Sequence, residues 1–156
     1  MHLETIETLR SSMKVSFQFF NELSDEELEV FLGCCENRQA AAGETLWCEG
    51  DSDSYAVFII SGKLGIKKRT EFEGKYIIVG TYSRGTVAGE LCLLTDYERS
   101  DTAVVLEPVD IVVLSSRNFE RLITEHPMLG LKLLKRIFLI VSRRLDISLD
   151  RIAKIF

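Results

Sequence analysis

The sequence has few residues of the kinds that bind metals. It contains two histidines, His2 and His126, and its four cysteines lack the paired spacing of a metal site. We therefore expect no zinc centre, no iron–sulfur cluster held by clustered N-terminal cysteines, and no metal. The cysteines are interpreted as reduced, structural residues: Cys34, Cys35, Cys48 and Cys92.

Long apolar runs and an excess of positive charge are also missing. No stretch reaches eighteen apolar residues, and the start has no basic segment followed by an apolar one, so we expect a cytoplasmic protein that does not enter a membrane. Asp and Glu outnumber Lys and Arg by 24 to 19, which gives a net charge of −5. A domain of this charge is not built to attract nucleic acid.

What the sequence does contain is a series of short β-rich runs separated by glycine turns. Many short strands at near-even spacing favour an antiparallel barrel or jelly roll over a βαβ fold. The fold class predicted is mainly β with flanking helices. The domain limits predicted are 1–36 for an N-terminal helical segment, 37–114 for the β-roll and 115–156 for C-terminal helices. The strands predicted are Thr45–Cys48, Tyr55–Ser61, Leu64–Arg69, Tyr76–Tyr82, Thr102–Leu106 and Val109–Leu114.

The N-terminal segment carries helix signals and a group of aromatic residues. A short helix is predicted over 1–13. Ser24 followed by Glu27 has the spacing of a capping box, so a second helix is expected to begin there. Phe17, Phe19 and Phe20 are expected to pack in the core.

The stretch from Ala88 to Thr102 combines the groups that would hold a small phosphorylated sugar. Gly89 has no Cβ, so backbone can approach a ligand closely. Glu90 can accept hydrogen bonds from sugar hydroxyls, and a helical turn over Glu90–Leu94 would point free N–H groups at an anion. Arg99, nine residues after Glu90, offers a fork of donors that matches two phosphate oxygens.

This stretch closely resembles the phosphate-binding cassette of cyclic-nucleotide-binding domains, which occur in catabolite activators, oxygen-responsive regulators and cAMP-dependent kinase regulatory subunits. Four positions depart from the family pattern, where Phe, Ala, Pro and Ala are usual: Ala88, Cys92, Glu98 and Asp101. The matching positions are Gly89, Glu90, Leu91, Leu93, Leu94, Arg99 and Thr102.

The resemblance implies a role for each residue of the site. Arg99 and Ser100, with the amides near Leu91 and Cys92, would bind the cyclic phosphate, and Glu90 would bind the ribose 2′-hydroxyl. The base would lie against apolar strand residues and a serine of the last helix: Ile77, Val79, Val87 and Ser148. Ser148 stands where the family has a threonine that contacts adenine, which favours cAMP over cGMP.

The last helix, predicted over 128–156, carries a heptad seam whose sole polar member is Ser148. The seam consists of Leu131, Leu134, Phe138, Val141, Leu145, Ser148, Ile152 and Ile155. It favours a homodimer through this helix over the alternative that the stripe only docks on its own β-roll. Arg143–Ser148 also resembles the dimerisation helix of catabolite activators. Those continue into a helix-turn-helix after this point, so DNA binding by this chain alone is not expected.

These features predict a cyclic-mononucleotide sensor that transmits ligand occupancy to its last helix, and not an enzyme. The alternative is a degenerate β-roll that acts as a ligand-free, dimerising scaffold. Asp101 supports that alternative, because in an extended strand it shares the face of Arg99, where it could repel a phosphate or pair with the guanidinium. A cupin-type enzyme would share the strand pattern, but the sequence lacks its metal histidines.

Overall fold

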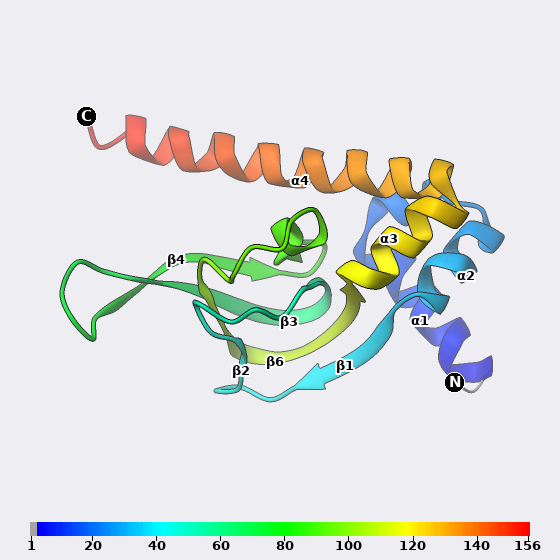
Figure 1. Ribbon diagram of the computed structural model, residues 1–156, viewed down its shortest axis with the longest axis horizontal. Coiled ribbons are helices and arrows are strands. Elements are labelled where there is room, and N and C mark those ends of the chain that lie inside the picture. Colours follow the sequence, from blue (N-terminus) through cyan, green and yellow to red (C-terminus); the bar gives the residue numbers. More distant parts are fainter. Residues whose placement is uncertain (1–2) are drawn as a thin grey trace.

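The computed structural model describes residues 3–156. Three layers are visible in Figure 1: a group of N-terminal helices at one end, a β-roll beside it, and one long helix, α4, that runs across both. The helical elements are α1 (Leu3–Ser16), η1 (Gln18–Glu22), α2 (Asp25–Gly33), η2 (Glu90–Leu93), α3 (Ser116–Glu125) and α4 (Pro127–Ala153). The first helix therefore ends three residues later than predicted, and positions 1 and 2 lie outside the described residues.

The strands form one antiparallel sheet, which confirms the predicted mainly β fold with flanking helices. Its order is β1-β6-β3-β4, with β2 paired to β6 and β5 paired to β3. The strands are β1 (Glu36–Ala40), β2 (Thr45–Trp47), β3 (Tyr55–Arg69), β4 (Tyr76–Ser83), β5 (Val87–Ala88) and β6 (Thr102–Ser115).

Two strands are longer than predicted, because glycine and proline bend them without ending them. The prediction divided β3 at Gly62 and β6 at Glu107-Pro108. In the structure these two points lie opposite each other within one continuous pair of strands, where Lys63 pairs with Glu107 between two register shifts. Gly62 has φ of +84°, and a Cβ there would lie 2.0 Å from the carbonyl oxygen of Pro108. The contact requires glycine, and it curls both strands into a roll.

Strand β1 was not predicted. Its sequence is Glu-Asn-Arg-Gln-Ala, and only Ala40 is buried, so it has no apolar alternation that would reveal a strand. It forms because its backbone pairs with β6 from Val109 to Val113.

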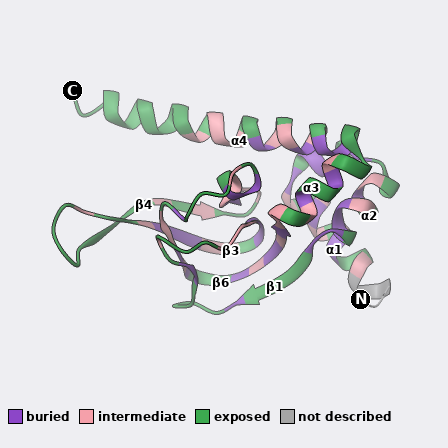
Figure 2. Ribbon diagram, in the orientation of Figure 1, coloured by how far each residue is buried: buried purple, intermediate pink, exposed green. Residues whose placement is uncertain are grey.

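The main core joins the N-terminal helices to the roll and to α4. Phe20 and Phe31 lie 5.1 Å apart between ring centroids, and Phe58 of β3 meets Phe17 and Phe31 edge to face at 5.8 and 5.4 Å. The predicted core role of Phe17, Phe19 and Phe20 is confirmed, since all are buried. Burial therefore concentrates where the helices meet the sheet (Figure 2).

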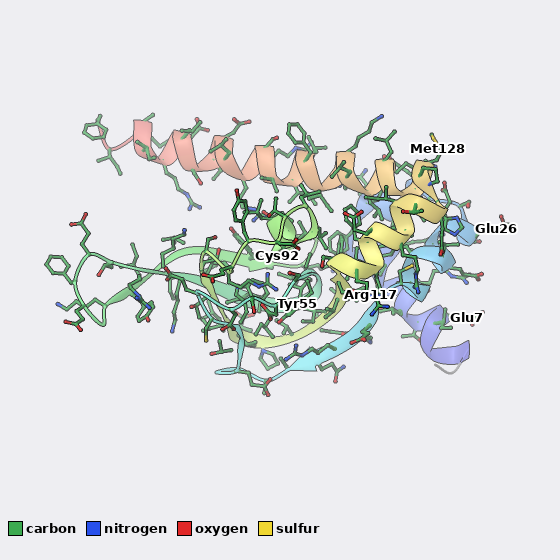
Figure 3. All side chains as sticks on the ribbon, in the orientation of Figure 1. Glu7, Glu26, Tyr55, Cys92, Arg117 and Met128 are labelled. Carbon is green, nitrogen blue, oxygen red and sulfur yellow. The ribbon has the colours of Figure 1, made fainter. Side chains whose placement is uncertain are left out.

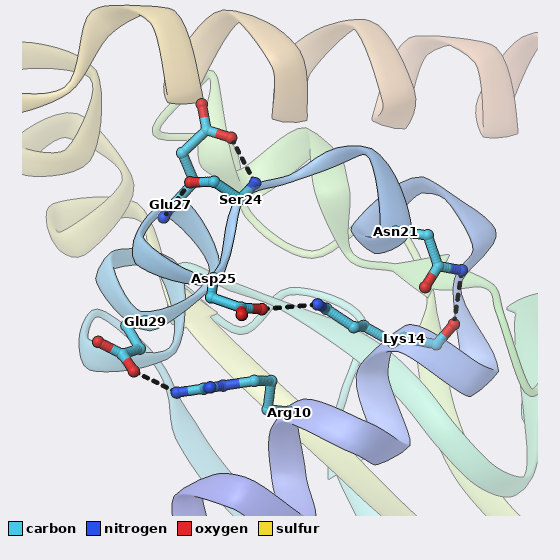
Figure 4. Close-up of polar contacts among 7 residues, drawn as sticks. All are labelled: Arg10, Lys14, Asn21, Ser24, Asp25, Glu27 and Glu29. Carbon is cyan, nitrogen blue, oxygen red and sulfur yellow. Dashed lines mark hydrogen bonds and ion pairs between the residues drawn. The ribbon is translucent and has the colours of Figure 1, made fainter.

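Polar contacts fix the first two helices against each other. Ser24 and Glu27 form the predicted capping box, in which each side chain accepts a hydrogen bond from the other residue's amide, at 3.1 and 3.0 Å. Lys14 donates to Asp25 at 2.8 Å, and Arg10 pairs with Glu29 (Figure 4). These pairs join α1 to α2.

Helix α4 begins at Pro127, directly after His126, which ends α3, and the long helix predicted over 128–156 extends to Ala153. It docks on the core through Leu129, Leu133 and Ile137, whereas every residue from 145 onward is exposed. The docking row thus differs from the heptad seam, whose Phe138 and Leu145 are 73% and 59% exposed. Two seam residues, Leu134 and Val141, also pack against the core, so attachment to the domain accounts for part of the seam but not for Phe138 or Leu145. Among the described helices, none has the length and apolar character needed to cross a membrane.

Candidate functional site

The stretch that resembles the cassette folds as a tight turn between β5 and β6. Gly89 adopts the left-handed conformation with φ of +72°, and η2 follows it from Glu90 to Leu93, as the sequence predicted for a helical turn. A Cβ on Gly89 would lie 2.5 Å from Nη1 of Arg99. Gly89 therefore serves two purposes that the sequence did not show: it permits the positive φ, and it leaves room for the arginine.

Arg99 is the one charged residue with a buried side chain in the described part of the chain, at 4% exposure. Its Nε donates to Asp53 at 2.9 Å, and one Nη donates to the carbonyl of Tyr55 at 2.8 Å. The guanidinium also lies over the rings of Trp47 and Tyr55, 4.0 and 4.6 Å from their centroids. Five donors on a planar group allow this many simultaneous contacts.

The remaining nitrogen of this guanidinium has no partner. Nη1 of Arg99 is buried and makes no hydrogen bond to any described group. An unpaired buried donor is costly, more so when it carries charge. This atom lies against Gly89, on the side of the cassette turn. The site therefore has an unused positively charged donor where the sequence predicted phosphate binding.

Asp101 does not occupy the position inferred from strand alternation. Its carboxylate accepts a hydrogen bond from Nε1 of Trp47 at 3.0 Å. The carboxylate that pairs with Arg99 is Asp53, which precedes β3 and was not singled out in the sequence. The internal pairing expected of Asp101 thus exists, but Asp53 makes it.

Glu90 lies within reach of helix α4. Its Oε1 is 3.7 Å from Nη1 of Arg144, and Arg144 also donates to the backbone carbonyl of Val87 at 2.7 Å. The same guanidinium lies over the ring of Tyr82, 4.2 Å from the centroid. One side chain of α4 is therefore tied to the cassette and to β4 together.

Three other cassette residues predicted to contact phosphate lie in different surroundings. Leu91 and Ser100 are exposed, whereas Cys92, labelled in Figure 3, is buried. The amide of Cys92 donates to the carbonyl of Gly89 at 3.2 Å, so this turn already uses it. Burial raises the pKa of the Cys92 thiol, which keeps it protonated at neutral pH.

The residues predicted to surround the base are divided between two places. Val79 and Ser148 line one cavity of about 340 Å³ between β4 and α4. Ile77 is 55% exposed on β4 and does not line it. Val87 is fully buried in the main core, so its side chain is not on the cavity wall.

Sequence reasoning missed the residues that hold the two charged groups in place. Trp47, Tyr55 and Asp53 surround Arg99 but lie 44 to 52 residues before it, and no local motif connects them. Arg144 lay within Arg143–Ser148, the stretch that resembles the dimerisation helix, but nothing in the sequence connected it to Glu90. No group of three or more His, Cys, Asp or Glu among the described residues could hold a metal ion.

Comparison with known proteins identifies the family. The family profile described as cyclic nucleotide-binding domain matches residues 37–126, which is more than half of the chain. The chain belongs to the cyclic nucleotide-binding domain family, as its cassette residues predicted.

Two relatives and one solved structure show the likeness. The chain is 28% identical over 134 residues to the cyclic AMP receptor protein of Thermus thermophilus, covering 84% of this chain and 60% of the relative. It is 30% identical over 109 residues to the cAMP-dependent protein kinase regulatory subunit of Mycosarcoma maydis, covering 67% of this chain and 20% of the relative.

The solved structure is a cyclic nucleotide-binding domain from Methylobacillus flagellatus KT. It superposes with a TM-score of 0.79 at 26% identity, covering 86% of this chain and 75% of that chain. The likeness confirms the β-roll fold. The chain spans less than two thirds of the length of either full relative, so each match concerns only part of that relative.

Proposed function

We propose that this chain is a sensor module that binds a cyclic mononucleotide and reports its presence through α4. The observation that carries the proposal is the unpaired Nη1 of Arg99, a buried cationic donor beside Gly89. A cyclic phosphate placed at this turn would accept from it and compensate the guanidinium. Ser100, exposed next to Arg99, supplies a hydroxyl for a second phosphate oxygen.

The pair formed by Glu90 and Arg144 would connect binding of the sugar to the position of α4. Glu90 would accept from the ribose 2′-hydroxyl, and it already lies 3.7 Å from Arg144 of α4. A ligand that reorients Glu90 changes what holds α4 on the cassette, so occupancy shifts the population of helix positions. No catalytic role is proposed for any of these groups, and the acidic net charge of −5 supports a partner other than nucleic acid.

The seam of α4 supports dimerisation as part of this function. Phe138, Leu145 and Ile152 are 73%, 59% and 54% exposed, spaced by seven along one face of the helix. A neighbouring groove of about 470 Å³ between η2 and α4 includes Leu91 and Leu94 of the cassette. A second copy packed along the seam would cover this apolar surface, including part of the cassette turn.

The scaffold alternative is favoured by one observation. Arg99 is only 4% exposed, and the carboxylate of Asp53 already pairs with its guanidinium. The positive charge is therefore compensated within the domain without a ligand. The two functions differ in whether ligand binds at all.

Calorimetric titration of the purified chain with cAMP and with cGMP tests the proposal, with light scattering to establish the oligomeric state. Saturable binding of either nucleotide to a dimer is expected. A folded protein that gives no heat with either would refute the sensor and leave the scaffold. Phe138→Asp should yield a monomer, whereas Asp at the exposed, off-seam Leu139 should affect the dimer less.

A further inference from the structure

The cavity between β4 and α4 has an unusual set of charges. Every charged residue that lines it is an arginine: Arg136, Arg143, Arg144 and Arg151. No carboxylate lines it, although the chain as a whole has a net charge of −5. Positions 136, 143 or 144, and 151 recur every seven or eight residues, which keeps them on one face of the helix. That face is directed at β4.

Three of these four arginines have no carboxylate partner among the residues that the structure describes. Arg144 pairs with Glu90 and lies over Tyr82, so its position is explained. None of the other three forms an ion pair within 4.0 Å with any described carboxylate. Nε of Arg136 is buried without a hydrogen-bond partner. Arg143 and Arg151 are exposed, so this wall of the cavity presents cationic donors that no carboxylate compensates.

The cavity also contains the residues expected to surround the base. Ser148 and Val79 line it, and Ser148 lies one helical turn from both Arg144 and Arg151. The hydroxyl of Ser148 donates to the carbonyl of Arg144 at 3.0 Å, and its oxygen can still accept from a base. A hydroxyl serves adenine and guanine alike, so Ser148 does not distinguish them.

Guanidinium groups do distinguish the two purines. Arginine has five donors and no acceptor. On its outer edge guanine presents two acceptors, O6 and N7, which match an arginine fork, whereas adenine presents N7 beside a donating amino group. An arginine can donate to both O6 and N7 of guanine. At adenine the same arginine would place a donor against the amino group, which is itself a donor.

From this arrangement we infer that the ligand's base is guanine, read at O6 and N7 by an arginine of α4, so that the module is selective for cGMP. The inference rests on the proposed function, because it assigns the base of the same ligand. It reverses the preference for cAMP that the sequence suggested through Ser148 alone. A bidentate pair of this kind is worth roughly 5- to 150-fold in affinity between bases.

Titration with three ligands tests the inference: cGMP, cAMP and inosine 3′,5′-cyclic monophosphate, which keeps O6 and N7 but lacks the 2-amino group. We expect the inosine and guanosine ligands to bind within about threefold of each other, and both about tenfold or more tightly than cAMP. An inosine ligand as weak as cAMP would overturn the assignment to O6 and N7.

Single substitutions identify the arginine that reads the base. Arg136→Ala, Arg143→Ala and Arg151→Ala are compared, and Arg144 is left intact because it contacts Glu90. At least one is expected to reduce cGMP affinity about tenfold while cAMP affinity stays within about twofold. Arg117→Ala, which removes the same charge from the exposed surface of α3 (Figure 3), is the control and should change neither.

The outcomes separate this inference from the proposed function. Equal binding of cAMP and cGMP that still depends on Arg99 overturns guanine selectivity and leaves the sensor intact. Absence of binding by all three ligands, in a folded protein, overturns both. Cyclic di-GMP binding more tightly than cGMP, in a way that depends on these arginines, would show that they compensate a second phosphate, and would also overturn the inference.

Discussion

Replacing Arg99 with alanine separates its role in the ligand site from its role in the fold. The substitution removes the unpaired Nη1 on which phosphate binding depends, and also the bonds to Asp53 and to the carbonyl of Tyr55. Truncating one member of a buried charge pair costs about 2–5 kcal/mol of binding free energy. That corresponds to roughly a 30-fold to 4,000-fold loss of affinity.

The fold should tolerate the same change better than the ligand site does. Asp53 is 39% exposed in its side chain, so water can replace the guanidinium around its carboxylate. The Tyr55 carbonyl loses a charge-assisted hydrogen bond worth about 1.5–3 kcal/mol. This loss is offset because the alanine variant no longer has to desolvate a buried cation. We therefore expect a measurable fall in thermal stability, with the protein still folded at 25 °C.

The assay is calorimetric titration of wild type, Arg99→Ala and Arg99→Lys, with circular dichroism to confirm folding. Lysine keeps the charge but lacks the fork that serves Asp53, Tyr55 and a phosphate together, so it should fall between the other two. Wild-type affinity in the alanine variant would refute the role of Arg99. An equal loss from Arg117→Ala, on the exposed surface of α3, would show a general charge effect instead.

Three further predictions concern the cassette turn and the start of α2. Gly89→Ala places a Cβ 2.5 Å from the Arg99 guanidinium at a φ of +72°, so both stability and cyclic-nucleotide affinity should fall, as thermal melts and titration will report. Ser24→Ala removes the capping box and should lower the free energy of unfolding by about 1 kcal/mol in urea titrations; no change would show that the cap is not stabilising. The hydrogen bond from Lys132 holds the pKa of Glu27 below its usual 4.5, so its stabilisation is complete above that value and is lost as the pH falls below it. Glu27→Gln should therefore flatten the acid side of the stability–pH curve, and an unaltered curve would contradict the pairing.

The sequence predicted most reliably those features that local chemistry specifies. The capping box at Ser24 and the turn after Gly89 each depend on a few neighbouring residues, and each forms as expected. Strand limits were less well predicted, because Gly62 and Pro108 bend β3 and β6 where such residues often end strands. β1 was missed since its pairing with β6 comes from topology.

The surroundings of the site could not be read from local patterns either. Asp53 and Trp47 reach Arg99 only because the roll brings the segment before β3 next to the cassette. Strand alternation placed Asp101 beside Arg99, yet its carboxylate bonds to the Trp47 indole. Residues far apart in sequence therefore decide which carboxylate compensates the arginine.

The position of Trp47 gives the domain an internal optical reporter. It is the single tryptophan of the chain, it is 2% exposed, and the Arg99 guanidinium lies 4.0 Å from its ring centroid. An anion arriving at that guanidinium would alter the electric field at the indole, whose N–H is already fixed by Asp101. Occupancy of the cassette would then change the emission of an unlabelled protein, and ligand arrival could be followed in real time, separately from any later movement of the long helix.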